Sequence, residues 1–162
     1  MTCFVTTKSN SCSSGTVSVG EALRYIRDDF DDVMVAGGAE APLSPLTYGA
    51  FAIIKTMSQS TGDPALSSRP FDRLRDGFVM GEGGASLVIE ELEHAKARGA
   101  HIYAEVLGYS LNNDAFHMTS PMPSGDSCIR AMRDDVSDAD LSTDQIYYIN
   151  SHARSTQLNA ST

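Results

Sequence analysis

Cys12 is the residue whose type and position best suit covalent chemistry. It lies in residues 9–15 (SNSCSSG), between a β-prone run at 2–7 and a predicted amphipathic helix at 13–27. A cysteine at a strand-to-helix turn is exposed, and the positive end of the helix stabilises the thiolate, which is the nucleophilic form. The position therefore indicates a nucleophile. A buried cysteine that packs as a small hydrophobic residue stays an open alternative on position alone.

His152 is the histidine best placed to assist such a nucleophile. It ends a predicted strand at 146–150 and precedes a polar loop. The carboxyl ends of parallel strands border the crevice in which ligands bind. His152 is therefore a candidate catalytic group, although a lone histidine has many other uses. Of the other histidines, His94 and His101 flank a helix end and are expected to be exposed, and His117 lies in a long polar loop.

The elements that must position these residues alternate between helices and strands. Apolar residues repeat with a helical period after Cys12, at Val19, Ala22, Leu23 and Ile26. A continuous apolar run at 33–36, ended by Gly37 and Gly38, predicts a strand buried on both faces, and residues 84–91 are expected to form another buried strand. Further predictions are helices at 47–55, 91–98 (ending at Gly99) and 126–136, and strands at 102–109 and 146–150. The alternation is typical of an α/β domain with a largely parallel sheet.

The composition is that of an ordinary globular protein and argues against several classes. No basic block offsets the net charge of −9, which disfavours a nucleic-acid or anionic-membrane surface. The three cysteines lack C-x-x-C spacing, so neither a disulfide framework nor a zinc site is expected, and Cys3 and Cys128 are interpreted as small hydrophobic residues. No apolar stretch suits a membrane span, and no signal peptide is recognisable. The expected compartment is the cytoplasm, with plastid and mitochondrion as open alternatives.

Five short segments form an ordered series along the chain. They are 11–15 (SCSSG), 33–41 (VMVAGGAEA), 68–83 (SRPFDRLRDGFVMGEG), 117–121 (HMTSP) and 149–156 (INSHARST). The series resembles the beta-ketoacyl-acyl-carrier-protein synthase family, with its nucleophile motif first and the motif around its first catalytic histidine last. The second and fourth segments look more like the dissociated, type II fatty-acid ketosynthases than the modular polyketide type.

This resemblance implies a thiolase-like fold, built from layers of helices and mostly parallel sheets. By it, residues 1–100 form the end of the N-terminal half, which carries the nucleophile. Residues 101–162 then begin the C-terminal half, with the first catalytic histidine. A complete synthase is more than twice this length, so the chain is expected to be an internal fragment that lacks N-terminal and C-terminal portions.

The resemblance also implies a decarboxylating Claisen condensation in fatty acid biosynthesis. Cys12 would accept an acyl group from acyl carrier protein, and the enolate formed from malonyl-acyl carrier protein would attack it. His152 would stabilise that enolate, and the Cys12 backbone N–H would contribute to the oxyanion hole. Thr119 and Thr156 match positions that hydrogen-bond pantetheine, and a loop at 112–121 would move to admit the acyl chain.

The partners implied by the family are acyl carrier protein and, in the full-length protein, a second copy of the chain in a homodimer. No cofactor is expected beyond the phosphopantetheine that carries the substrates on acyl carrier protein. Neither a metal, a nucleic acid nor a membrane span is expected.

Several positions depart from the family pattern. The Gly-Thr that usually follows the histidine is replaced by Ala153 and Arg154, so a long cation stands where a hydroxyl contacts pantetheine. The usual Pro-x-Gly-Asp run is replaced by 157–160 (QLNA), and Asp140 occupies the position of a turn glycine. Because these positions differ and the chain lacks the N-terminal and C-terminal portions of a complete synthase, the isolated chain is expected to be inactive. A non-catalytic, truncated relic of a ketosynthase stays an alternative.

Overall fold

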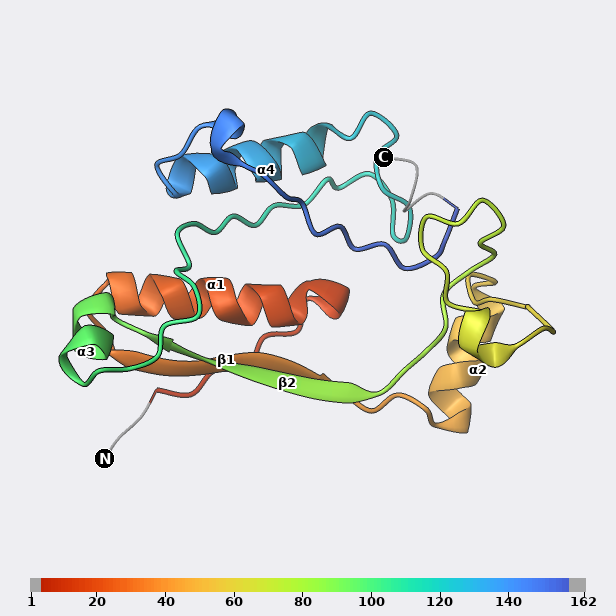
Figure 1. Cartoon of the computed structure of the whole chain (residues 1–162). Coiled ribbons are helices and arrows are strands. Elements are labelled where there is room, and N and C mark those ends of the chain that lie inside the picture. Colours follow the sequence, from red (N-terminus) through yellow and green to blue (C-terminus); the bar gives the residue numbers. More distant parts are fainter. Residues whose placement is uncertain (1–3, 158–162) are drawn as a thin grey trace. The chain divides into compact units, whose positions relative to one another are not determined.

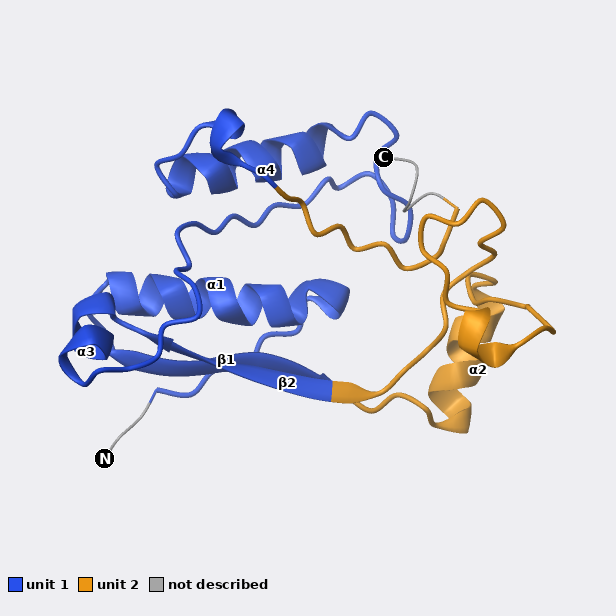
Figure 2. Cartoon of the chain, viewed as in Figure 1, with its two compact units in different colours: residues 1–39, 84–147 blue, residues 40–83, 148–162 orange. Residues whose placement is uncertain are grey.

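The computed structural model describes residues 4–157, which divide into two compact units (Figure 2). The described part of unit 1 comprises residues 4–39 and 84–147. The described part of unit 2 comprises residues 40–83 and 148–157. Unit 2 is therefore formed by one long excursion of the chain together with its C-terminal segment.

The described part of unit 1 holds a helix-covered strand pair and four further elements. Its elements are η1 (Ser11–Ser13), α1 (Ser14–Arg27), β1 (Val33–Glu40), β2 (Gly83–Glu90), α3 (Leu92–Ala97), α4 (Asp126–Asp138) and η3 (Thr143–Gln145), with β1 and β2 each reaching one residue into unit 2. Strands β1 and β2 form a two-stranded sheet. Helix α1 lies along it, and the Gly37 N–H donates to the Ser18 Oγ at 3.0 Å.

Strands β1 and β2 run in opposite directions (Figure 1). Gly84 at the start of β2 lies against Ala39 at the end of β1, and the Glu91 N–H after β2 donates to the Asp32 carbonyl before β1 at 2.9 Å. This pairing differs from the expected parallel arrangement. The chain leaves β1 and returns to the same end of it, so β2 must run back along β1. A parallel partner would need a crossover connection instead.

Helix α1 agrees with the predicted helix at 13–27, because its apolar residues repeat with the helical period and so share one face. Val17 and Leu23 on its inner face are buried, and Arg24 in the last turn suits the negative end of the helix dipole. Helix α3 also ends as predicted, with Gly99 in the left-handed region at φ 68°. Both predictions are confirmed.

The strands predicted at 102–109 and 146–150 are absent from the described residues. Both segments lack a strand assignment, because neither has a neighbouring strand that completes a backbone hydrogen-bond ladder. The first segment is instead held by helix α4. The Tyr109 N–H donates to the Asp138 carboxylate at 2.8 Å, and the Ser110 Oγ donates to the Ala131 carbonyl at 2.7 Å. Sequence alternation predicts an extended backbone but does not supply the partner.

The two strands that do form are not buried on both faces. Val35 in β1 is 71% exposed, and Leu87 and Val88 in β2 are 55% and 64% exposed. The buried apolar residues of unit 1 are Val17, Ala22, Leu23, Ala36, Ala95 and Tyr109. The core therefore lies between helix α1 and one face of β1, and it is small.

Unit 2 contains helix α2 (Pro45–Ile53), the turn η2 (Pro64–Leu66) and long irregular segments. Helix α2 begins two residues before the predicted start, because the Ser44 hydroxyl accepts the Thr47 N–H at 3.3 Å and Pro45 occupies the first turn. A parallel bridge joins Met57 to Phe78. None of the described helices in either unit is long and apolar enough to cross a membrane.

Candidate active site

Cys12 lies in the turn η1, directly before helix α1, and its side chain is exposed. Three hydrogen bonds close this turn. The Asn10 N–H donates to the Ser14 Oγ at 2.8 Å, the Ser14 hydroxyl donates to the Ser11 carbonyl at 2.7 Å, and the Ser13 hydroxyl donates to the Asn10 carbonyl at 2.8 Å. The thiol thus stands at the amino end of a 14-residue helix, as the sequence predicted for its position.

Ser11, the residue before Cys12, has a left-handed backbone with φ 52°. This conformation is costly for a residue with a side chain and persists only where its surroundings impose it. The three hydrogen bonds of the turn provide that constraint. The left-handed Ser11 thus belongs to the hydrogen-bonded turn that directly precedes Cys12.

Glycines bring the helix that carries Cys12 close to the sheet. A Cβ built on Gly38 would lie 3.3 Å from the Cα of Gly15 in α1, and one on Gly37 would lie 2.1 Å from the Ala85 carbonyl oxygen. Larger residues at these positions would separate α1, β1 and β2. The run at 33–36 was expected to end at Gly37 and Gly38, whereas both glycines lie within β1 and permit this contact.

Cys128 does not pack as a small hydrophobic residue. It is exposed in the first turn of helix α4, so the expected burial is wrong. Exposure alone consequently does not distinguish Cys12 from Cys128. Cys3 lies outside the described residues.

Thr119 lies in a loop whose backbone N–H groups donate hydrogen bonds to the side chains of His117 and Asp114. The His117 Nδ1 accepts the backbone N–H groups of Thr119 and Ser120, each at 3.1 Å. The Asp114 carboxylate accepts the N–H groups of Phe116 at 3.1 Å and Met122 at 3.0 Å, and these two hydrogen bonds lower the pKa of Asp114. The Thr119 side chain is exposed.

His152 is exposed and follows an extended segment in unit 2. Partial desolvation lowers the pKa of His152, and the charge of Arg154 acts in the same direction. Both effects favour the neutral imidazole, which keeps one N–H available as a hydrogen-bond donor at neutral pH.

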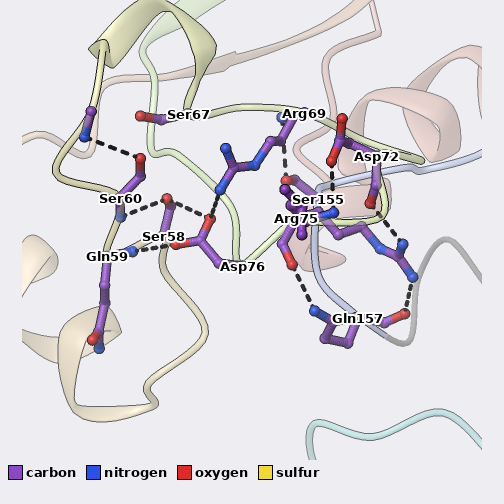
Figure 3. Close-up of polar contacts among 12 residues, drawn as sticks. Ser58, Gln59, Ser60, Ser67, Arg69, Asp72, Arg75, Asp76, Ser155 and Gln157 are labelled. Atoms are coloured by element: carbon purple, nitrogen blue, oxygen red, sulfur yellow. Dashed lines mark hydrogen bonds and ion pairs between the residues drawn. The ribbon is translucent and has the colours of Figure 1, made fainter.

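The segment that follows His152 is held by a loop about eighty residues away in the sequence (Figure 3). Ser155 is fully buried, its Oγ accepts the Arg69 N–H at 3.3 Å, and its carbonyl accepts the Gly77 N–H at 3.1 Å. The Arg75 side chain donates to the carbonyls of Thr156 and Gln157. The turn-rich sequence of residues 58–77 does not by itself indicate these contacts. The resemblance of 68–83 to a family motif was the one signal available.

The Thr156 hydroxyl is buried and has no hydrogen-bond partner among the described residues. A buried hydroxyl without a partner is costly, so it is suited to receive a polar group of a ligand. Thr156 lies four residues after His152 in unit 2, whereas Cys12 and Thr119 lie in unit 1. Two of the four predicted site residues therefore lie in each unit, and no contact among the described residues joins Cys12 to Thr119.

Within residues 4–157, no group of three or more His, Cys, Asp or Glu side chains could hold a metal ion.

The chain is similar to known ketosynthases over nearly its whole length. Residues 3–95 match the family model of the beta-ketoacyl synthase N-terminal domain, and residues 103–162 match that of the C-terminal domain. The chain is 44% identical over 149 residues to 3-oxoacyl-[acyl-carrier-protein] synthase 2 of Synechocystis, with 92% of this chain and 36% of that protein covered. It is 46% identical over 155 residues to the tetracenomycin polyketide synthase ketoacyl synthase alpha subunit of Streptomyces glaucescens, with 96% and 36% covered.

One solved structure is a type II PKS acyl-carrier protein in complex with its ketosynthase. It matches with a TM-score of 0.89 and 40% identity over 92% of this chain and 37% of that chain. The chain therefore spans little more than a third of the length of these relatives.

Proposed function

Because the chain belongs to the beta-ketoacyl synthase family, we propose that its residues serve a decarboxylating Claisen condensation on substrates carried by acyl carrier protein. In this proposal residues 1–100 supply the end of the N-terminal half of the synthase, and residues 101–162 supply the beginning of the C-terminal half. The observation that carries the proposal is the exposed Cys12 thiol at the amino end of α1.

In the first half-reaction, the Cys12 thiolate attacks the thioester carbonyl of an acyl group on acyl carrier protein. The carbon–sulfur bond to pantetheine breaks, the pantetheine thiol takes up a proton, and the acyl group remains on Cys12. The Cys12 backbone N–H at the helix amino end would stabilise the negative charge on the carbonyl oxygen.

In the second half-reaction, malonyl-acyl carrier protein loses carbon dioxide, and the electron pair of the broken bond forms an enolate. The neutral imidazole of His152 donates a hydrogen bond to the enolate oxygen, where negative charge develops. The enolate carbon then attacks the acyl-Cys12 carbonyl, which releases the Cys12 thiolate and the 3-oxoacyl product. Thr119 and Thr156 bind pantetheine in this proposal. The buried, unpartnered hydroxyl of Thr156 supports its role.

The proposed partners are acyl carrier protein and a second copy of the synthase. The solved relative in complex with a type II acyl-carrier protein supports the first. No cofactor beyond the phosphopantetheine of acyl carrier protein is needed for either half-reaction. The proposed compartment is the cytoplasm or an organelle that makes fatty acids.

A polyketide substrate is a second candidate, because the Streptomyces relative is as similar to this chain as the fatty-acid synthase relative is. The chemistry at Cys12 and His152 is the same for both. The two candidates differ only in the acyl chain and in the carrier protein that delivers it.

A chimera tests the proposal while supplying the remainder of a synthase. We would replace the matching segment of the Synechocystis enzyme with this chain and mix the purified chimera with acyl and malonyl acyl carrier proteins. Mass spectrometry should find the acyl group on Cys12 and then the 3-oxoacyl product, and Cys12→Ala should abolish both. A folded chimera that is never acylated at Cys12, or that is acylated but makes no product, contradicts the proposal and favours the non-catalytic alternative.

A further inference from the structure

The segment that carries His152 and Thr156 is not stabilised by secondary structure of its own. It contains no helix or strand. Ala153 and Ser155 both have left-handed φ angles, of 38° and 68°. Such angles are unfavourable for residues other than glycine. Contacts from elsewhere in unit 2 must therefore impose this shape.

Arg75 makes the most extensive of these contacts (Figure 3). Its Nε donates to the Thr156 carbonyl at 3.1 Å, its Nη2 to the Gln157 carbonyl at 2.7 Å, and its Nη1 to the Asp72 carbonyl at 3.0 Å. In return, the Gln157 Nε2 donates to the Arg75 carbonyl at 2.6 Å. One half-buried guanidinium thus joins the carbonyls of two successive residues in the site segment to its own loop.

The loop around Arg75 is itself well constrained. Asp76 accepts hydrogen bonds from the Ser58 hydroxyl and the Gln59 N–H, each at 2.9 Å, and pairs with Arg69 at 3.3 Å. A Cβ on Gly77 would lie 2.4 Å from the carbonyl carbon of Met57, so the backbone there is tightly packed. Arg75 therefore extends from a well-constrained loop toward the segment at 152–157.

We propose that Arg75 is a positioning residue for the condensation step. It holds the carbonyls of Thr156 and Gln157, and through them it sets where the Thr156 hydroxyl and the His152 imidazole stand. This inference rests on the proposed function. Arginine suits this role, because a planar guanidinium spans two neighbouring carbonyls and a lysine ammonium, as a single point, does not.

The test compares two readouts in the Synechocystis chimera. The first is alkylation of Cys12 by iodoacetamide, which requires neither His152 nor Thr156. The second is release of carbon dioxide from malonyl-acyl carrier protein, the step in which His152 acts. Arg75→Met should slow carbon dioxide release by about tenfold to a hundredfold, as expected for the loss of two hydrogen bonds from a charged group. Alkylation of Cys12 should stay within about twofold.

Two further variants separate positioning from general destabilisation. Arg73→Met removes an exposed arginine two residues away and should leave both readouts unchanged. Arg75→Lys keeps the charge and most of the stem, and it should recover only part of the lost rate. A purely structural role for Arg75 would lower the thermal midpoint of the Arg75→Met chimera along with its rate of carbon dioxide release, and that result would overturn the inference.

The failures of the two proposals are distinguishable. If the unsubstituted chimera alkylates at Cys12 but releases no carbon dioxide, the proposed function fails. If it releases carbon dioxide and Arg75→Met does so at the same rate, only the role of Arg75 is overturned.

Discussion

Arg154 stands two residues after His152, at a position where the family usually has threonine. Its charge is the second cause of the lowered His152 pKa, after partial desolvation. A lowered pKa keeps the imidazole neutral at pH values where an ordinary histidine is protonated. The Arg154 charge therefore keeps the His152 imidazole neutral at lower pH than that of an ordinary histidine. The neutral imidazole is the form that donates a hydrogen bond to the enolate in the proposed reaction.

Arg154→Thr should consequently narrow the pH range of activity from its acid side. Removing the cation lets the pKa of His152 rise toward its ordinary value, so more imidazole is protonated at a given acid pH. The acid limb of condensation should move to higher pH, measured in the chimera between about pH 5 and 8. Arg73→Thr, which removes an exposed cation elsewhere in unit 2, should leave the limb in place. A limb that does not move in Arg154→Thr contradicts the electrostatic role.

The same substitution should strengthen binding of pantetheine thioesters. A threonine hydroxyl can donate one hydrogen bond where the family places one, and a bond of this kind is worth about 0.5–1.5 kcal/mol. Affinity for acyl carrier protein thioesters should rise about two- to twelvefold. The measurement belongs at about pH 8, where His152 is neutral in both proteins and the pH effect is absent. Equal affinities would mean that position 154 does not contact pantetheine.

Cys12 should react with iodoacetamide faster than Cys128, by about threefold or more. Both thiols are exposed near helix amino ends, but the first turn of α4 contains the Asp126 carboxylate and that of α1 contains no acidic residue. A nearby carboxylate repels the negative charge that sulfur carries as it attacks iodoacetamide. Peptide mapping of the chimera after brief alkylation measures both rates.

Asp126→Asn provides the matched comparison for this difference. It should speed alkylation of Cys128 and leave that of Cys12 unchanged. Equal rates for both cysteines in the unsubstituted protein would refute a special reactivity of Cys12.

At the level of elements, Tyr109 joins the segment after residue 102 to helix α1. Its side chain is 6% exposed and lies against Gly20, and the guanidinium carbon of Arg24 is 4.9 Å from the centre of its ring. A Cβ on Gly20 would lie 2.0 Å from this ring. The glycine is thus needed for the ring to reach the helix.

Gly20→Ala should therefore destabilise the protein by about 1–3 kcal/mol through overpacking. Gly49→Ala is the control, because Gly49 also lies within a helix but has no atom within 4 Å of its would-be Cβ. Alanine should stabilise that helix by about 0.5–1 kcal/mol. Thermal unfolding of the two chimera variants should give shifts of opposite sign. If both variants unfold at a higher temperature than the unsubstituted chimera, the Tyr109 ring moves to make room for the extra methyl group.

At the scale of the whole chain, the apolar core is small relative to the exposed surface. The accessible surface is 12,241 Å², against about 7,800 Å² expected for a compact protein of 17.3 kDa. A typical interface between domains buries about 600–1,500 Å², which is less than this excess. Large apolar side chains in both units, such as Val35 and Ile53, are more than two-thirds exposed.

Expressed alone, the chain should not unfold as a cooperative domain. Few buried apolar groups oppose an ordering entropy of about 1–2 kcal/mol per residue, and the exposed strands β1 and β2 invite aggregation. Circular dichroism during a urea titration should show a broad or absent transition. A sharp transition in a soluble monomer would refute this expectation. It would also mean that the apolar faces of the two strands have found a closed arrangement.

The features that the sequence determined by itself are those with short-range causes. The helical spacing of apolar residues predicted α1, Gly99 predicted the end of α3, and the turn between 9 and 15 predicted the exposed position of Cys12. The ordered motifs also identified the family and its thiolase-like fold, which the family models and the solved ketosynthase confirm. The catalytic roles of Cys12 and His152 stay predictions.

The tertiary structure alone decided which distant segments meet. Strand β2 pairs antiparallel with β1, and the predicted strand at 102–109 has no partner strand, because alternation assigns faces to a strand but not its neighbour. Arg75 reaches Thr156 and Gln157 across about eighty residues, and the hydrogen bonds join a side chain to backbone carbonyls. Carbonyls are identical at every position in the chain. No local pattern therefore indicates which of them an arginine will bind until folding brings the two loops together.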